Sequence, residues 1–315
     1  MVPTAPERLP IIVLGGRDPR VSEMPEGVEG LHPLAGYKGV AVHMGGRALI
    51  ESVVHRLVES GQFEPVYIAG PQSVYADHCT GARIVDVAGA IDATVRAGIE
   101  AVSSAHPGVP MAVTTCDVLP DVDTLGQVMA EYRRMAPCDG FLPMIRAPSD
   151  HADLGASAYK PLYRVVPEAG AAPVEVLPCH LAVLDAQALR MEFIYRVLRL
   201  MYRTRNRPIA YRRAVILRGL AFELLYQDLR HVLGLRMPTF SWSVLSAGLP
   251  AVRALKAGTI TRAHLEQAMR RIFVTARHQR LHPERRIVMP IVEGLSLALD
   301  IDTEEEATAM GGELD

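Results

Sequence analysis

The sequence predicts an α/β fold, in which a mostly parallel sheet is flanked by helices and carries an inserted helical subdomain. Short apolar runs alternate with segments of helical periodicity up to about residue 135. Residues 186–281 are almost wholly helical in pattern, and strand-like sequence returns at residue 286. Regular alternation of strand and helix is typical of right-handed crossovers between parallel strands. We therefore expect an α/β domain of residues 1–185 and 285–315, interrupted by a helical insertion of residues 186–284.

The first half of the chain supplies the alternating elements. Four apolar runs predict strands at residues 11–14, 65–69, 82–85 and 110–115. Between these runs, apolar positions recur with the spacing of one helix face. The clearest face consists of Leu49, Ile50, Val53, Val54, Leu57 and Val58. Similar faces within residues 91–102 and 125–132 predict two more helices.

The second half begins with strand-like sequence, becomes helical, and ends with strand-like sequence again. Five runs are strand-like, at residues 141–145, 159–166, 174–184, 286–289 and 296–301. Within the helical stretch, Thr261 is a suitable N-cap for a helix that begins at Arg262. We expect the last two runs to complete the α/β domain.

Composition indicates a globular protein of the cytoplasm. Hydrophobic residues make up 49% and charged residues 22% of 315 positions, which excludes a disordered chain and a membrane bundle. The net charge of −2 gives no general case for nucleic-acid binding. The four cysteines have no CxxC spacing, and the N-terminus lacks the pattern of a signal peptide. We therefore expect a cytoplasmic protein with reduced thiols.

Basic residues are concentrated in the predicted helical insertion. Residues 186–235 contain ten arginines and three acidic residues. One interpretation is a packed helical subdomain with a solvated basic face. Another is a docking surface for an anionic acceptor, such as a phosphorylated or lipid-linked alcohol, or for the inner surface of the membrane. No recognised nucleic-acid module frames these arginines, so we expect no nucleic-acid partner.

Two short stretches point to chemistry at strand ends. The run PMAVTTCDVLP ends its predicted strand at a lone acid, Asp117. The run IIVLGG ends at Gly15 and Gly16 without the GxGxxG pattern or a Walker A loop. Bare backbone after a strand lets a phosphate or a base approach closely, although a tight turn would also explain the glycines. In open parallel sheets, ligands bind at the carboxyl ends of the strands.

Five segments in order resemble the MobA-like NTP transferase family. They are IIVLGGRD, AGYKGVAVHMGGRALIESVVHRL, VAGAIDATVRAGIEAV, VTTCDVLP and ALDIDTEEEA. The resemblance covers roughly residues 9–145 and 286–308, and it implies a GT-A-like fold. It also implies site residues. These are Leu14, Gly15, Gly16, Gly89 and Ala90 for the nucleotide, Arg17 and Lys38 for catalysis, and Asp117 and Asp302 for Mg²⁺, with Asp300 as second choice for Asp302.

The resemblance implies a Mg²⁺-dependent nucleotidyltransferase. Such an enzyme moves a nucleoside monophosphate from an NTP to a phosphorylated small molecule or lipid-linked acceptor and releases pyrophosphate. Mg²⁺ prefers oxygen ligands, while arginine and lysine suit phosphate oxygens. The alternatives are a GT-A glycosyltransferase and a non-catalytic binding or scaffold protein. The first alternative usually has a DxD motif at the metal strand, where this chain has Asp117 alone.

For three further residues, the sequence favours a structural role over a functional one. Lys160 could reach the acceptor, but we favour a plain strand-edge position for it. His278 and His282 have the i, i+4 spacing of a metal pair on one helix face. No third ligand accompanies them, so we expect a polar helix end.

Overall fold

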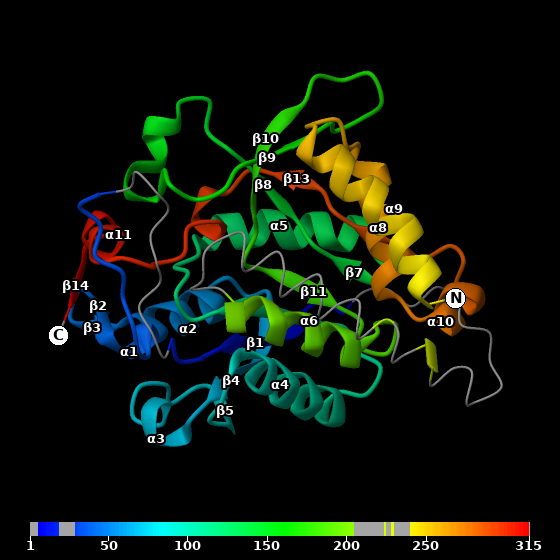
Figure 1. Ribbon diagram of the computed structural model, residues 1–315. Helices are drawn as coiled ribbons and strands as arrows, with labels where there is room; N and C mark the ends of the chain where they lie inside the picture. Colours follow the sequence, from blue (N-terminus) through cyan, green and yellow to red (C-terminus); the bar gives the residue numbers. More distant parts are fainter. Residues whose placement is uncertain (1–5, 19–28, 205–223, 225–227, 230–239, 315) are drawn as a thin grey trace.

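The computed structural model describes residues 6–18, 29–204, 224, 228–229 and 240–314. A seven-stranded sheet runs through its centre in the order β12-β7-β11-β6-β1-β4-β5 (Figure 1). Strand β1 (Leu9–Leu14) pairs in parallel with β4 (Phe63–Gly70) and β6 (Met111–Thr115), and β4 pairs in parallel with β5 (Arg83–Asp86). The predicted mostly parallel α/β sheet is therefore confirmed.

The strands of this sheet are apolar on both sides because helices cover both faces of the sheet. On one face, α2 (Leu49–Glu59) and α5 (Val122–Met135) pack against Ile11 and Val13. On the other face, α4 (Ile91–Ala105) and α6 (Met191–Thr204) pack against Ile12. Successive side chains of a strand point to opposite faces, so β1 contributes to both cores. The helices predicted within residues 48–58, 91–102 and 125–132 are confirmed.

A second, four-stranded sheet has the order β13-β8-β10-β9. Its strands are β13 (Ile291–Val292), β8 (Met144–Arg146), β10 (Val174–Pro178) and β9 (Tyr163–Val165). The chain passes between the two sheets at three points, from β7 (Gly140–Phe141) to β8, from β10 to β11 (Ala182–Leu184), and from β12 (Ile287–Val288) to β13.

Each of these crossings lies at a proline, namely Pro143, Pro178 and Pro290. Proline has no N–H to donate to a strand ladder, which favours the end of a strand at or beside it. The predicted single strands at residues 141–145 and 174–184 were therefore wrong in their extent, because each is divided between two sheets. The predicted strand at residues 296–301 is also wrong. A short 3-10 helix, η2 (Leu295–Leu297), begins there, and only Asp300 forms a bridge, to Val118.

A small third sheet, β14-β2-β3, lies beside the central sheet. It pairs β14 (Gly312–Leu314), near the C-terminus, with β2 (Val42–Met44), which forms a hairpin with β3 (Arg47–Ala48). The hairpin turn is Gly45-Gly46, both with positive φ, at 57° and 75°. Positive φ at both central positions is the geometry that matches hairpin twist, and it favours glycine.

The segment 186–284 contains four described helices, which are α6, α8 (Phe240–Lys256), α9 (Arg262–Phe273) and α10 (Ala276–Leu281). Thr261 is the N-cap of α9, as predicted, because its side chain accepts a hydrogen bond from the backbone N of His264. The division into an α/β domain and a separate insertion stays a prediction. Within the described residues, no helix is both long and apolar enough to span a membrane.

Most of the arginine-rich stretch lies outside the described residues. Of its ten arginines, only Arg190, Arg196 and Arg199 have described side chains. Arg199 forms an ion pair with Asp92 on α4 at 2.6 Å, and Arg190 donates to the carbonyl of Val274. These two contacts are internal to the chain. The predicted docking surface stays a prediction.

Candidate metal and nucleotide site

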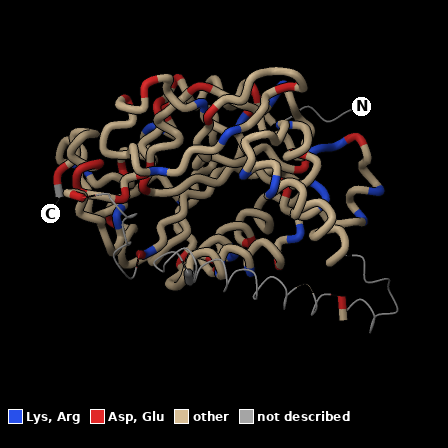
Figure 2. The backbone as a smooth tube through the Cα atoms, turned by 45° about the horizontal axis from the view of Figure 1, so that its top comes forward, with Lys and Arg blue, Asp and Glu red and all other residues tan. Residues whose placement is uncertain are grey.

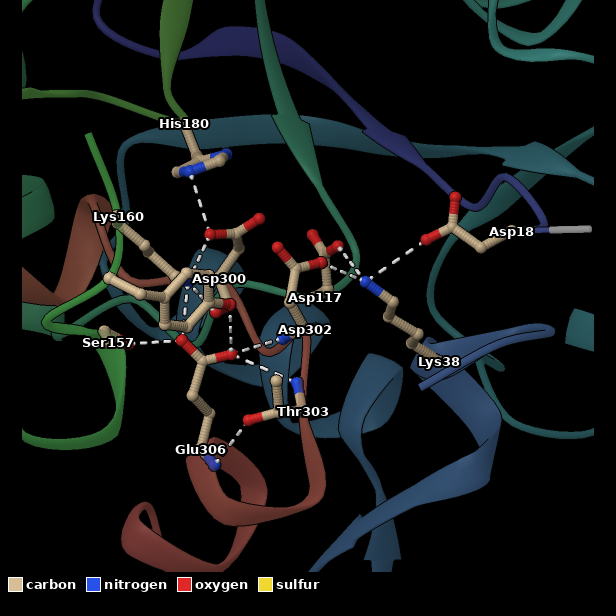
Figure 3. Close-up of polar contacts among 11 residues, drawn as sticks. Asp18, Lys38, Asp117, Ser157, Lys160, His180, Asp300, Asp302, Thr303 and Glu306 are labelled. Carbon is tan, nitrogen blue, oxygen red and sulfur yellow. Dashed lines mark hydrogen bonds and ion pairs between the residues drawn. The ribbon is translucent and has the colours of Figure 1, made fainter. Parts of the chain in front are cut away.

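Three aspartates meet at the carboxyl edge of the central sheet (Figure 3). Asp117 follows β6, and Asp300 and Asp302 precede α11 (Glu304–Ala309). Each offers one carboxylate oxygen, and these oxygens lie within 4.8 Å of one another. The two segments run side by side, since the backbone N of Ile301 donates to the carbonyl of Asp117 at 2.8 Å. Asp117 and Asp302, predicted from the resemblance, are thus brought together, and the second-choice Asp300 joins them.

Lys38 lies among these acids at the start of α1 (Lys38–Ala41), with 4% of its side chain exposed. Its ammonium donates a hydrogen bond to Asp302 Oδ1 and lies 3.2 Å from Asp18 Oδ2 and 3.7 Å from Asp117 Oδ2. Burial lowers the pKa of Lys38, but the nearby carboxylates raise it by more, so its pKa is above the ordinary value. Lys38 is therefore a buried, charged cation in contact with three acids.

Lys160 forms the second cation of the cluster. Its ammonium contacts Asp300 Oδ1 at 2.6 Å and Glu306 Oε1 at 2.9 Å, and it also donates to the Asp300 carbonyl. The predicted plain strand-edge position of Lys160 was wrong, because its side chain is 8% exposed and points into this cluster. Burial raises the pKa of Asp300, but His180, 3.5 Å away, and Lys160 lower it by more. The pKa of Asp300 is therefore below its ordinary value.

The cluster fits a divalent cation. Among the described residues, five carboxylates (Asp18, Asp117, Asp300, Asp302 and Glu306) face two ammonium groups (Lys38 and Lys160), so the carboxylates outnumber the ammonium groups. In addition, Asp117 Oδ1 is a buried atom without a hydrogen-bond partner. A buried carboxylate oxygen of this kind is costly unless another group satisfies it. Carboxylate oxygens are the ligands that Mg²⁺ prefers.

The loop after β1 places the predicted nucleotide residues at the same edge of the sheet. Leu14 ends β1, and the backbone N of Gly15 already donates to the carbonyl of Ala69 at 2.9 Å. A Cβ atom at Gly15 would lie 2.6 Å from the ring of Tyr75, so this glycine is required by packing. A Cβ atom at Gly16 would meet only Ile91, at 3.8 Å.

Ile91 is the first residue of α4, which therefore begins beside the loop after β1. Gly89 and Ala90 precede it, and Ala90 is the N-cap of α4 without a capping side chain. The amide groups at a helix N-terminus attract anions. The two predicted nucleotide segments thus adjoin each other, while their role in nucleotide binding stays a prediction.

Arg17 differs from Lys38 in its surroundings. Its side chain is exposed, and its guanidinium lies 5.9 Å from the centre of the Tyr37 ring. The neighbouring Asp18, rather than Arg17, contacts Lys38. Asp18 is positioned by two backbone hydrogen bonds with Gly36, of 2.9 and 2.8 Å. The catalytic role predicted for Arg17 stays a prediction.

Sequence reasoning missed three residues of this cluster, namely Asp18, His180 and Glu306, and it placed a fourth, Lys160, at a strand edge. One signal was available, because lysine occurs at only three positions, Lys38, Lys160 and Lys256, and two of them lie here. The acidic residues had no comparable signal. Acidic residues are concentrated at the end of the molecule that carries the C-terminus (Figure 2).

His278 and His282 lie at a polar helix end, as expected. His278 Nε2 contacts Asp139 Oδ1 at 2.9 Å, and His282 is the C-cap of α10. Asp139 is fully buried and also contacts Arg270 at 3.1 Å and Arg285 at 3.2 Å. This second charged cluster ties α9 and α10 to the central sheet.

A scan against protein-family models finds no match, and a search of curated proteins finds none either. Solved structures with similar folds include 4-diphosphocytidyl-2C-methyl-D-erythritol synthase from Anaerococcus prevotii, with 8% identity, coverage of 97% of both chains and a TM-score of 0.44. Another is 2-C-methyl-D-erythritol 4-phosphate cytidylyltransferase from Thermus thermophilus, with 12% identity, coverage of 96% of this chain and 97% of that chain, and a TM-score of 0.40. A third is CMP:2-keto-3-deoxy-manno-octonic acid synthetase complexed with CTP, with 10% identity, coverage of 68% and 84%, and a TM-score of 0.40.

Proposed function

We propose that this chain is a Mg²⁺-dependent nucleotidyltransferase. It would move a nucleoside monophosphate from an NTP to an anionic small molecule or lipid-linked acceptor, with release of pyrophosphate. The observation that carries this proposal is the meeting of Asp117, Asp302 and Lys38 at the carboxyl edge of a parallel sheet. Acids that hold a metal and a cation that faces phosphate recur in sites that bind nucleoside triphosphates.

The acidic and the basic residues of the site have different proposed roles. Asp117 and Asp302 would hold the metal, with Asp300 as a third oxygen donor. When bound, Mg²⁺ would neutralise phosphate charge and orient the triphosphate. Lys38 forms ion pairs with both Asp117 and Asp302, which reduces the repulsion between these two acids. Its positive charge would also attract the phosphates. Catalysis of this kind depends mainly on positioning and on stabilising charge.

The nucleotide would lie over the loop after β1. Gly16 and the start of α4 at Ala90 supply a backbone surface without large side chains. Arg17 is exposed beside this loop and would contact phosphate oxygens there. We propose the cytoplasm as the location of this chain, on the cysteine spacing of the sequence.

The proposal is tested by thermal shifts of the full chain with ATP, CTP, GTP and UTP, each with Mg²⁺ or with EDTA. We expect one NTP to raise the melting temperature only with Mg²⁺, and we expect this shift to vanish in Asp117→Asn. The control variant Asp123→Asn, at an exposed position of α5, should keep the shift. Pyrophosphate release in the presence of phosphorylated acceptors then identifies the reaction.

Other outcomes would support the alternatives. A shift with nucleotide sugars and no pyrophosphate release would favour a glycosyltransferase. The absence of a shift with any nucleotide or nucleotide sugar would contradict an enzyme of either class and leave a binding or scaffold protein.

A further inference from the structure

One buried carboxylate, that of Glu306, gathers hydrogen-bond donors from two distant segments (Figure 3). Glu306 lies in the first turn of α11 and is 2% exposed. Its Oε2 accepts from the backbone N of Asp302 at 2.7 Å and from that of Thr303 at 3.1 Å. The Thr303 side chain accepts in turn from the Glu306 N, which completes a capping box. Glu306 therefore fixes the backbone at Asp302.

The other donors to Glu306 come from residues 157–160. Ser157 donates its hydroxyl to Oε1, Tyr159 donates to Oε2 at 3.3 Å, and Lys160 contacts Oε1 at 2.9 Å. The Glu306 carboxylate thus contacts both the backbone of Asp302 and the side chain of Lys160. The segment before β9 is tied through it to the acids of the candidate metal site.

The donors of Lys160 are fully used in these contacts. An ammonium group has three N–H donors. Those of Lys160 face Asp300 Oδ1, the Asp300 carbonyl and Glu306 Oε1. Lys160 therefore has no donor left for an acceptor molecule, and its contacts fix Asp300 by both side chain and backbone.

We infer that Glu306 and Lys160 are positioning residues that set the separation of Asp300 and Asp302 for metal binding. This inference rests on the metal site of the proposed function. Glu306 fixes Asp302 and Lys160 fixes Asp300, while the Glu306–Lys160 contact joins the two. Partners behind metal ligands commonly change metal affinity by about 10–100-fold when they are replaced.

Positioning can be separated from simple charge by comparing variants. Glu306→Gln removes one negative charge from the cluster, and Lys160→Met removes one positive charge. If charge alone mattered, Lys160→Met would bind a divalent cation more tightly. If Lys160 positions Asp300, the same variant binds it more weakly. The double variant Glu306→Gln/Lys160→Met keeps the net charge of the wild type and leaves neither Glu306 nor Lys160 as a charged group without the other.

The experiment titrates the full chain with Mn²⁺ and measures free Mn²⁺ by electron paramagnetic resonance, without nucleotide. We expect one Mn²⁺ per wild-type chain, and a dissociation constant about 10–100-fold higher in Lys160→Met and in the double variant. Circular dichroism reports whether each variant is folded. Glu305→Gln is the matched control on the same helix, because Glu305 contacts His32 and none of the three aspartates. Its dissociation constant should equal that of the wild type.

Two results would overturn the inference. The first leaves the proposed metal site standing, and the second overturns the metal site as well. If the folded double variant binds Mn²⁺ as tightly as the wild type while Asp117→Asn does not bind it, the positioning role is wrong and the metal site stands. If the wild-type chain itself binds no Mn²⁺, both the positioning role and the proposed metal site are wrong.

Discussion

Lys38 and Asp302 lie 264 positions apart in the sequence and form a hydrogen-bonded ion pair at the edge of the central sheet. The same ammonium contacts Asp18 and Asp117. Three segments therefore meet on one buried cation. Without this cation, their carboxylates would repel one another in a partly buried setting.

Lys38→Met should destabilise the protein strongly when no metal is present. Removing one partner from a buried ion pair commonly costs about 3–5 kcal/mol. Added Mg²⁺ should recover part of the loss, because a divalent cation can neutralise the same acids. Urea unfolding in EDTA and in Mg²⁺ measures both effects. Lys256→Met is the control at an exposed lysine, and an equal loss of stability there would contradict this role of Lys38.

Asp117→Asn should have the opposite effect on the metal-free protein. The cluster carries excess negative charge, and Asp117 Oδ1 has no hydrogen-bond partner. We expect the free energy of unfolding in EDTA to rise by about 0.5–2 kcal/mol, as in other sites where function opposes stability. The stabilisation by Mg²⁺ should be lost in the same variant. A fall in stability in EDTA would show that Asp117 has a structural role instead.

Gly15→Ala should destabilise the protein more than Gly16→Ala. A methyl group at Gly15 would lie 2.6 Å from the Tyr75 ring, whereas one at Gly16 would meet only Ile91 at 3.8 Å. Overpacking of this kind typically costs about 1–3 kcal/mol. Thermal unfolding of both variants tests this difference. If both lose the same stability, the packing explanation for Gly15 is wrong.

Asp139→Asn should weaken the attachment of α9 and α10 to the sheet. Asp139 is fully buried and contacts Arg270, Arg285 and His278. Loss of its charge removes the carboxylate partner of Arg270 and leaves Arg285 with Asp185 at 2.8 Å, and we expect a cost of about 3–5 kcal/mol. The exposed Asp77→Asn should stay within about 0.5 kcal/mol of the wild type. Equal melting temperatures for the two variants would contradict this prediction.

The His32–Glu305 contact should depend on pH. The hydrogen bond that the His32 ring donates to Glu305 raises the pKa of His32 above its ordinary value of 6.5, and His32 lowers the pKa of Glu305 from 4.5 to about 2. The contribution of the protonated His32 ring to the stability of the folded protein is complete below pH 6.5 and is lost as the pH rises through its raised pKa. That of Glu305 is present above pH 4.5 and is lost as the pH falls toward 2.

The contact should therefore be strongest between pH 4.5 and 6.5. NMR titration of the His32 ring should give a pKa above 6.5 in the wild type, and one closer to 6.5 in Glu305→Gln. Glu304→Gln should change the His32 pKa less, because the charge of Glu304 raises this pKa by less than Glu305 does. An unchanged pKa in Glu305→Gln would show that the two side chains do not interact in solution.

Local patterns in the sequence were sufficient for the central sheet. Runs such as residues 11–14 and 110–115 are buried on both faces, and helical periodicity marks the helices that cover them. These signals are local, because burial on one strand or one helix face is written in neighbouring residues. The passages at Pro143, Pro178 and Pro290 were not predicted, since sequence alone does not show which sheet receives the next strand.

For the candidate site, too, some features follow from local sequence and others only from the tertiary structure. The sequence by itself determined that Asp117 ends a buried strand, that Gly15 and Gly16 follow another, and that Lys38 is one of only three lysines. Only the tertiary structure decided that Asp18, Lys160 and Glu306 belong with them. Lys160 contacts Asp300, 140 positions away, Glu306 accepts from Ser157, 149 positions away, and Asp18 meets the other acids at the ammonium of Lys38. Charge interactions depend on distance in space, and a periodic pattern along the chain carries no record of that distance.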